Sequence, residues 1–271
     1  QTRAMALCHE MVPGAKIGPA PNIWALYPAS CKAEDITAAG LFSAIRNWFY
    51  LDMAVHGVYN HQVWHFLEEQ DALPEIQPGD MEILASGHPD FIAFNYYSTA
   101  TAAMDDSTEK ADPAVFDQQR AASWPGLYRS AKNPNLPVTQ WGWEIDPVGF
   151  RNTLNEVYSR YRLPILITEN GLGAYDKLEP DGTVQDDYRI EYLQKHIEQM
   201  QLAIDDGVEM LGYCPWSAID LISTHEGFEK RYGFIYINRD NFDLKDMARI
   251  RKKSFFWYQK VIAANGADLS N

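Results

Sequence analysis

The amino-acid sequence predicts an α/β fold, and three observations support this prediction. Segments typical of strands and of helices alternate along the chain, which favours a parallel sheet covered by helices. Polar and aromatic residues follow the ends of strands, at 95–97, 169–170 and 216–220, as they do at the C-terminal face of a (β/α)8 barrel. Only four segments are typical of core strands. We therefore expect about half a barrel, folded as a single partial domain over residues 1–271.

The first part of the chain alternates between the two kinds of element. Residues 1–11 are typical of the last part of a helix, and residues 16–23 of a strand that leads into a proline-containing loop. The pattern over 34–69 is mostly helical. Asp80 is expected to cap the short helix that follows it. The apolar segment 91–97 is typical of a buried strand.

The second part of the chain begins with a long polar stretch. Residues 98–146 show no regular pattern, and loops of this length in compact domains are often functional. Pro147 is expected to begin an amphipathic helix. The remaining predicted elements are a strand over 164–171, a helix over 186–207, a strand over 209–220, an extended segment over 231–238 and a final helix over 245–266.

Charge and cysteine content exclude several classes of protein. The formal net charge is −14 and no stripe of Lys or Arg occurs, so a nucleic-acid partner is not expected. Cys8, Cys31 and Cys214 form no metal-binding or redox motif, which favours reduced thiols in a cytoplasmic protein without a metal or cofactor. The sequence shows no apolar run long enough for a membrane span and no signal-peptide pattern, so no membrane partner is expected.

Glu169 is the strongest candidate for a catalytic residue. It lies in Ile-Thr-Glu-Asn-Gly (167–171), directly after the apolar residues 164–166. A carboxylate at the mouth of a buried strand is partly desolvated and needs partners. A capping or salt-bridged glutamate in a strand-to-helix loop is the alternative, and the residues alone leave the two interpretations equally open.

Three motifs together resemble glycoside hydrolase family 1 across essentially the whole chain. They are ITENG, FNYY (94–97) and GYCPWSAIDLISTHEGFEKRYGFIYIN (212–238). The resemblance implies a (β/α)8 barrel that hydrolyses β-glycosides with retention, with Glu169 as the nucleophile of a covalent glycosyl-enzyme intermediate. It also implies that Tyr97 keeps this carboxylate ionised and that Asn95 binds the hydroxyl beside the anomeric carbon. Without ITENG, a buried aromatic strand would be the better interpretation of FNYY.

The third motif points to a phosphorylated substrate. Relatives that act on plain glucosides have Glu at the position of Ser223, and a carboxylate there would repel a 6-phosphate. Serine removes that charge, Lys230 supplies a cation and Tyr232 a phenolic donor. This set resembles the phosphate site of 6-phospho-β-glucosidases and 6-phospho-β-galactosidases; the alternative is a surface lysine and a strand tyrosine. Thr224, where galactoside-type members have Trp, favours the glucoside or a relaxed specificity.

Tryptophans supply the remaining candidates. Trp216 matches the family's aromatic platform under the sugar, although a tryptophan at a strand end is more often part of the core. The segment WGWEIDPVG (141–149) resembles the phospho-glucosidase subgroup. Trp141 or Trp143 could therefore wall the side that holds the leaving group, and the sequence does not distinguish between them.

The family's acid/base motif, Thr-x-Asn-Glu-Pro, does not occur in this sequence. The only Asn-Glu is Asn155-Glu156, within a predicted helix. The resemblance begins at the end of the fourth barrel helix, so we expect the C-terminal half, roughly strands 5 to 8, of a longer protein. Loss of the acid costs about 10²–10⁴-fold in rate, and an open barrel leaves unpaired edges.

Two functional hypotheses follow from the missing motif. The first is the nucleophile and phosphate-binding half of a cytoplasmic 6-phospho-β-glucosidase, inactive unless a complementary N-terminal fragment supplies the acid/base. The second is a non-catalytic truncated half-barrel that self-associates as a homo-oligomer.

Overall fold

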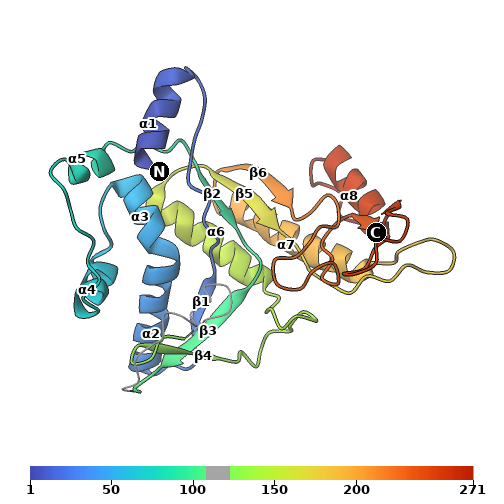
Figure 1. Ribbon diagram of the computed structural model, residues 1–271, viewed down its shortest axis with the longest axis horizontal. Helices are drawn as coiled ribbons and strands as arrows, with labels where there is room; N and C mark the ends of the chain where they lie inside the picture. The colour runs from blue at the N-terminus through green and yellow to red at the C-terminus, as the bar shows by residue number, and fades with distance from the viewer. Residues whose placement is uncertain (108–122, 271) are drawn as a thin grey trace.

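The computed structural model describes residues 1–107 and 123–270 of the chain. Its central feature is a three-stranded parallel sheet in the order β2–β5–β6 (Figure 1). The three strands are Ile92–Asn95, Ile165–Asn170 and Met210–Pro215. Apolar and β-branched side chains suit a buried sheet, and the parallel pairing confirms the predicted α/β organisation.

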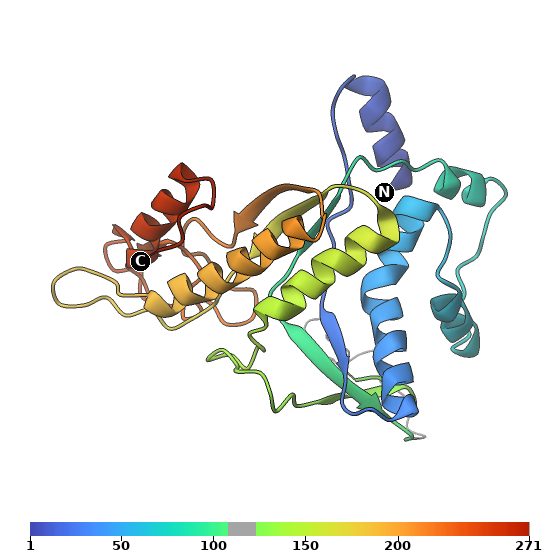
Figure 2. The same ribbon diagram turned by 180° about the vertical axis from the view of Figure 1, so that it is seen from behind.

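Two long helices, α6 (Pro147–Tyr161) and α7 (Asp187–Asp205), cover one face of this sheet (Figure 2). The predicted start of α6 at Pro147 is confirmed, because the Asp146 carboxylate accepts a hydrogen bond from the Gly149 N–H at 2.8 Å. The apolar stripe of α6 then packs against the sheet, where Phe150 is fully buried.

The predicted strand over 16–23 is wrong as a regular strand, although the segment runs beside β2. Backbone hydrogen bonds run from the Ala93 N–H to the Pro19 carbonyl (2.8 Å) and from the Asn95 N–H to the Pro21 carbonyl (3.0 Å). The two prolines have no N–H to donate in return, so only the Ile23 N–H, which donates to the Asn95 carbonyl at 3.0 Å, completes a single bridge at Asn22. Regular pairing begins only further along, in β1 (Ala25–Pro28).

The predicted irregular stretch 98–146 contains two strands, which corrects that expectation. β3 (Thr99–Met104) pairs in parallel with β1 and antiparallel with β4 (Tyr128–Ala131), giving a second sheet in the order β1–β3–β4. The sequence TATAAM in β3 has no large apolar residue before its last position, so its strand pattern is weak. Residues 108–122, also within that stretch, lie outside the described part of the chain.

The helical prediction over 34–69 is confirmed, with a break at Gly57. This glycine ends α3 with a left-handed backbone (φ 65°), and the Asn60 side chain then caps the next helix. Asp80 is not an N-cap: Gly79 has that position, and the Asp80 carboxylate accepts from the Gln77 N–H at 2.8 Å. The helices of this part are α1 Thr2–Met11, α2 Ala33–Ser43, the π-helical turn η1 Ala44–Trp48, α3 Phe49–His56, α4 His61–Glu69 and α5 Asp80–Ala85.

The C-terminal part confirms one expectation and corrects another. Within the predicted extended segment 231–238, residues Ile235–Ile237 form β7, which pairs with β8 (Arg249–Arg251) in a sheet of its own. The predicted final helix over 245–266 is therefore too long, and α8 covers only Lys253–Ala263. Antiparallel pairing with β7 prevents residues 249–251 from continuing the helix toward its N-terminus.

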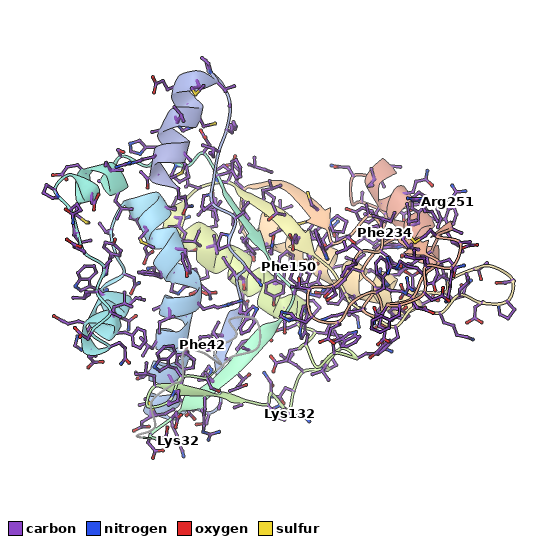
Figure 3. The ribbon with its side chains drawn as sticks, viewed as in Figure 1. Lys32, Phe42, Lys132, Phe150, Phe234 and Arg251 are labelled. Atoms are coloured by element: carbon purple, nitrogen blue, oxygen red, sulfur yellow. The ribbon has the colours of Figure 1, made fainter. Side chains whose placement is uncertain are left out.

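Among the residues that the structure describes, buried apolar side chains form three clusters, and Figure 3 labels one phenylalanine from each. Phe150 lies in the largest cluster, between the central sheet and its helices. Phe42 belongs to the cluster between α2 and the second sheet, and Phe234 to the cluster around α7 and α8. Each of the two larger sheets, and the pair α7 and α8, is thus packed against an apolar cluster of its own.

Candidate active site

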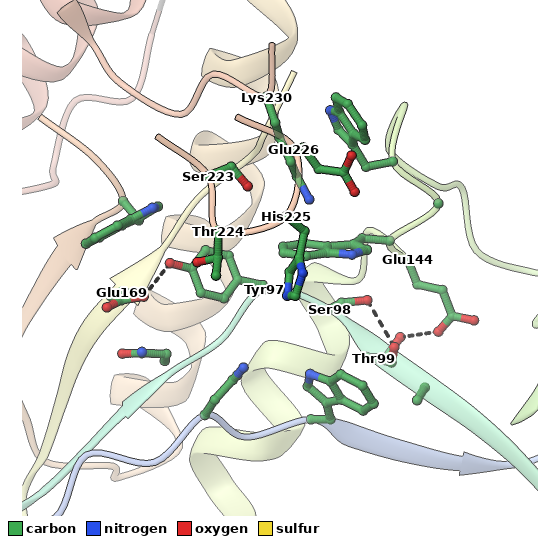
Figure 4. A pocket seen from close by; sticks show the side chains of 18 of the residues that line it. Tyr97, Ser98, Thr99, Glu144, Glu169, Ser223, Thr224, His225, Glu226 and Lys230 are labelled. Atoms are coloured by element: carbon green, nitrogen blue, oxygen red, sulfur yellow. Dashed lines mark hydrogen bonds between the residues drawn. The ribbon is translucent and has the colours of Figure 1, made fainter. Parts of the chain in front are cut away.

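One cavity of about 710 Å³ is lined by all seven residues that the sequence indicated for the site. Figure 4 shows Tyr97, Glu169, Ser223 and Lys230 around it. The seven residues come from the ends of β2, β5 and β6 and from the loop that precedes β7. The seven are Asn95, Tyr97, Glu169, Trp216, Ser223, Lys230 and Tyr232. Residues up to 137 positions apart in the sequence, from 95 to 232, therefore line one space.

Glu169 and Tyr97 form a closely hydrogen-bonded pair in this cavity. Pairing of β2 with β5 places Asn95 opposite Glu169, and the Tyr96 N–H donates to the Glu169 carbonyl at 2.9 Å. The Tyr97 hydroxyl donates to the Glu169 carboxylate at 2.5 Å. Burial, and then this hydrogen bond, raise the pKa of Tyr97 well above its usual value. Tyr97 is therefore a neutral donor to an acceptor carboxylate.

Asn95 is oriented by its neighbour on the adjacent strand. The Thr168 hydroxyl donates to the Asn95 side-chain oxygen at 2.7 Å. This contact assigns the amide oxygen to Thr168, so the amide nitrogen is the atom that can donate to a ligand in the cavity.

Asn170 and Gly171, the last two residues of the ENG motif, have structural roles. The buried Asn170 amide donates to the Tyr96 carbonyl at 2.6 Å and accepts from the Tyr213 hydroxyl at 2.6 Å, so it ties the three central strands together. A Cβ on Gly171 would lie 1.9 Å from the Trp216 carbonyl oxygen. Glycine is thus required at position 171 for the close approach of Trp216 to the end of β5. There the Trp216 N–H donates to the Asn170 carbonyl.

The predicted phosphate set lies together on the loop before β7. Ser223 hydrogen-bonds the Tyr232 hydroxyl, and burial raises the pKa of Tyr232 to about 12. Lys230 is 5% exposed, and its side chain reaches into the cavity (Figure 4). The Lys230 ammonium nitrogen lies 3.6 Å from the centroid of the Trp143 ring. A cation and two hydroxyls are therefore presented to the same space.

A cluster of buried charged side chains packs against this loop. Asp220 accepts from Arg231 at 3.0 Å and from Lys252 at 2.7 Å, and Lys252 also contacts Asp176. Asp176 and Asp186 are both paired with Arg189, at 3.1 and 3.3 Å. The cluster therefore comprises Asp176, Asp186, Asp220, Arg189, Arg231 and Lys252, whose side chains are at most 5% exposed. Asp220, which the sequence pattern placed near the site, has this structural role.

Several lining residues were not indicated by the sequence. Arg46 lies over the Trp24 ring, 4.2 Å from its centroid. The Glu144 carboxylate accepts from the Thr99 hydroxyl at 2.5 Å, and His225 projects into the cavity (Figure 4). The position of Glu144 directly after Trp-Gly-Trp was a usable signal, whereas Arg46 lies within a helical segment without any motif.

Glu156, the glutamate of the only Asn-Glu pair, is distant from this cavity in the fold. It lies on α6 and lines a second cavity of about 420 Å³, together with residues of β1, α2 and α4. Within the described ranges, no group of three or more His, Cys, Asp or Glu could hold a metal ion. The same part of the chain contains no helix that is both long and apolar enough to cross a membrane.

Comparison with known proteins identifies a family to which this chain is similar. The model of glycosyl hydrolase family 1 matches residues 1–267. The aryl-phospho-β-D-glucosidase BglC of Bacillus subtilis is 45% identical over 98% of this chain and 57% of that protein. A 6-phospho-β-glucosidase of Dickeya chrysanthemi is 42% identical, with 99% of this chain and 55% of that protein covered.

A solved structure agrees with these matches. The family 1 β-glucosidase from Thermotoga maritima superposes with a TM-score of 0.84 at 33% identity, covering 98% of this chain and 55% of that one. The chain thus spans about half the length of the relatives that it matches. A family model that extends over nearly every residue, with relatives more than 40% identical, leads to one conclusion: this chain belongs to glycosyl hydrolase family 1.

Proposed function

We propose that this chain is the nucleophile and phosphate-binding part of a retaining 6-phospho-β-glucosidase. The observation that carries the proposal is one cavity holding both the Tyr97–Glu169 pair and the Lys230 ammonium. In the proposal, residues 1–271 form a single partial domain that corresponds to strands 5 to 8 of a (β/α)8 barrel. The names of relatives that act on phosphorylated glucosides support the substrate class.

The proposed chemistry begins with attack by Glu169 on the anomeric carbon. Tyr97 donates to the carboxylate and orients it, while Asn95 binds the neighbouring sugar hydroxyl and Trp216 forms the platform under the ring. The sugar phosphate lies against Lys230. The leaving oxygen needs a proton donor, and the family's Asn-Glu-Pro motif is not in this sequence. We therefore propose that a complementary N-terminal fragment supplies the acid/base for full turnover.

Covalent labelling tests the nucleophile without requiring that acid. Fluoride leaves without protonation, so 2-deoxy-2-fluoro-β-glucosyl fluoride 6-phosphate should react with Glu169 and remain attached. Mass spectrometry of the intact chain should show one added glycosyl group, located by peptide mapping to Glu169. The Glu169→Gln variant should remain unlabelled. Label on another residue, or none at all, would contradict the assignment.

Lys230 tests the substrate class. We expect Lys230→Met to weaken binding of glucose 6-phosphate by about 10- to 150-fold, since one charge-assisted contact contributes about 1.5–3 kcal/mol. Binding of deoxynojirimycin, which has no phosphate, should be nearly unchanged. Isothermal titration calorimetry measures both ligands on both proteins. An equal loss for the two ligands would refute the phosphate assignment.

Selectivity between glucosides and galactosides depends on the residue beside Ser223. Thr224 lines the cavity where galactoside-type relatives have tryptophan, which favours 6-phospho-β-glucosides, and 6-phospho-β-galactosides are the alternative substrates. A cytoplasmic location is part of the proposal, because phosphorylated sugars do not cross membranes unaided.

A truncated, self-associating half-barrel is the second candidate. One observation favours it: β6 lies at the edge of the described central sheet, and Leu211 on this strand is 46% exposed. Unpaired edges readily pair with another chain. Light scattering after size exclusion should then show a homo-oligomer that Leu211→Lys converts to a monomer. A monomer that takes up the covalent label would exclude this candidate.

A further inference from the structure

The buried ammonium of Lys230 lies among three aromatic rings. Its nitrogen lies 3.6 Å from the ring centroid of Trp143, 5.3 Å from that of Trp141 and 5.7 Å from that of Tyr232. A buried ammonium loses hydration, and the face of an aromatic ring partly replaces it. We call these three rings the aromatic cage.

The surrounding chain is shaped to hold this arrangement. The Thr139 hydroxyl accepts from the N–H groups of both Trp141 and Trp143, at 3.2 and 3.1 Å, which fixes the turn that carries the two indoles. A Cβ on Gly173 would lie 2.7 Å from Cε and 2.8 Å from Cγ of Lys230. The missing side chain at Gly173 is thus the space that the lysine stem occupies.

Trp143 also reaches the reaction centre. Its ring meets the ring of Tyr97 edge-on, with centroids 5.7 Å apart, and Tyr97 donates to Glu169. Trp143 therefore contacts both the cation and the tyrosine that holds the nucleophile.

We propose that the aromatic cage selects phosphorylated substrates, and that Trp143 is its specificity-determining residue through its hold on Lys230. The inference rests on the proposed function of Lys230 as the phosphate contact. An aromatic face attracts an ammonium but has no net charge, so it positions Lys230 without cancelling the charge that a phosphate needs. This matters here because Glu226 also lines the cavity, and its charge adds to the raised pKa of Tyr232.

A double-mutant cycle on Trp143 and Lys230 tests the cage. We expect Trp143→Leu to weaken glucose 6-phosphate binding by about 3- to 30-fold, the range of a desolvated cation–π contact. In the Lys230→Met variant, Trp143→Leu should change the affinity for glucose 6-phosphate less than about twofold. Trp143 then has no cation to position, so the interaction energy between the two positions is absent. Glucose 6-phosphate has no leaving group, so an aglycone wall would produce no change in either background.

Matched variants separate the cage from a general packing effect. Trp143→Phe keeps a ring face and should recover most of the affinity, and Trp141→Leu, at the longer distance, should cost less than Trp143→Leu. Deoxynojirimycin has no phosphate, so its binding measures any loss that comes from the Tyr97 contact, and we expect that loss to be smaller than the loss for glucose 6-phosphate. Equal losses with and without Lys230, or no loss in Trp143→Leu, would overturn the cage while leaving the phosphate contact intact. No effect of Lys230→Met itself would overturn the proposed function.

Discussion

At the scale of single residues, the hydrogen bond between Tyr97 and Glu169 organises the candidate site. The phenol is held neutral by burial, so it can only donate to the carboxylate. A hydrogen bond from a neutral phenol orients a carboxylate without transferring its own proton. This geometry supports the proposed role of Glu169 as the nucleophile.

Removing this donor should slow glycosylation. We expect Tyr97→Phe to lower the rate of labelling by the fluoro sugar phosphate by about 10- to 150-fold, because a hydrogen bond to a charged group contributes about 1.5–3 kcal/mol. The affinity for glucose 6-phosphate should change much less, since Lys230 is untouched. Labelling rates at saturating probe, combined with calorimetry, separate the two effects. An unchanged rate would show that the contact serves packing alone.

Most individual site residues could be predicted from the sequence, because they lie in short motifs at strand ends. The structure brings Glu169 and Lys230 into one cavity, but their catalytic and binding roles remain predictions. Two features were beyond the sequence. The closer approach of Trp143 than of Trp141 to Lys230 depends on long-range packing, and Arg46 enters the cavity because η1 packs near Trp24. Which tryptophan walls the leaving-group side stays a prediction.

At the scale of elements, the sequence predicted strands well where their side chains are large and apolar. It failed where prolines interrupt the hydrogen bonding and where the side chains are small. Segment 16–23 has an apolar pattern, but its prolines cannot complete a ladder, whereas small side chains conceal β3. Residues 249–251 continue a helical pattern, yet pairing with β7 makes them a strand. Pairing between distant segments cannot be predicted from the few residues on either side of a strand.

The turn after β5 gives a test at this scale. Gly171→Ala would place a methyl group against the Trp216 carbonyl, so β5 or the Trp216 segment must shift. We expect the free energy of unfolding to fall by about 1–3 kcal/mol, as for other overpacked sites. Gly40→Ala is the control, because nothing lies within 4 Å of its added methyl on α2. It should stabilise by about 0.5–1 kcal/mol. Urea unfolding of both variants decides, and equal effects would contradict the close-approach argument.

At the scale of the whole molecule, the buried charge cluster joins segments that are distant in sequence. Lys252 at the start of α8 contacts both Asp176, in the loop after β5, and Asp220, in the loop after β6. The cluster therefore links the end of the chain to the loop that carries Lys230. Its three acidic and three basic groups balance, as buried charges require.

Breaking this cluster should be costly. Lys252→Met leaves two buried carboxylates with one cation fewer, and we expect unfolding free energy to fall by about 3–5 kcal/mol. Lys253→Met is the neighbouring control, because Lys253 pairs with Asp187 at the surface, where both side chains are about half exposed. Such a pair contributes at most about 1 kcal/mol. Urea unfolding followed by tryptophan fluorescence compares them, and similar losses would mean that the cluster is not a stability determinant.

The stability of the whole fold should depend on pH through His196. This side chain on α7 is fully buried against Tyr192, and burial lowers its pKa from 6.5 to about 4. Below pH 6.5 the unfolded chain binds a proton there that the folded chain does not, so unfolding becomes easier as pH falls. The contribution is fully present above pH 6.5 and is lost between pH 6.5 and 4.

The loss should reach about 3 kcal/mol across that window, from 1.36 kcal/mol for each unit of pKa. His196→Phe keeps an aromatic ring beside Tyr192 and Phe150 and cannot be protonated, so its unfolding free energy should lack this part of the slope. Carboxylates such as Asp52 titrate in both proteins, so the readout is the difference between them. Parallel curves for wild type and His196→Phe would show that His196 is protonated equally in both states.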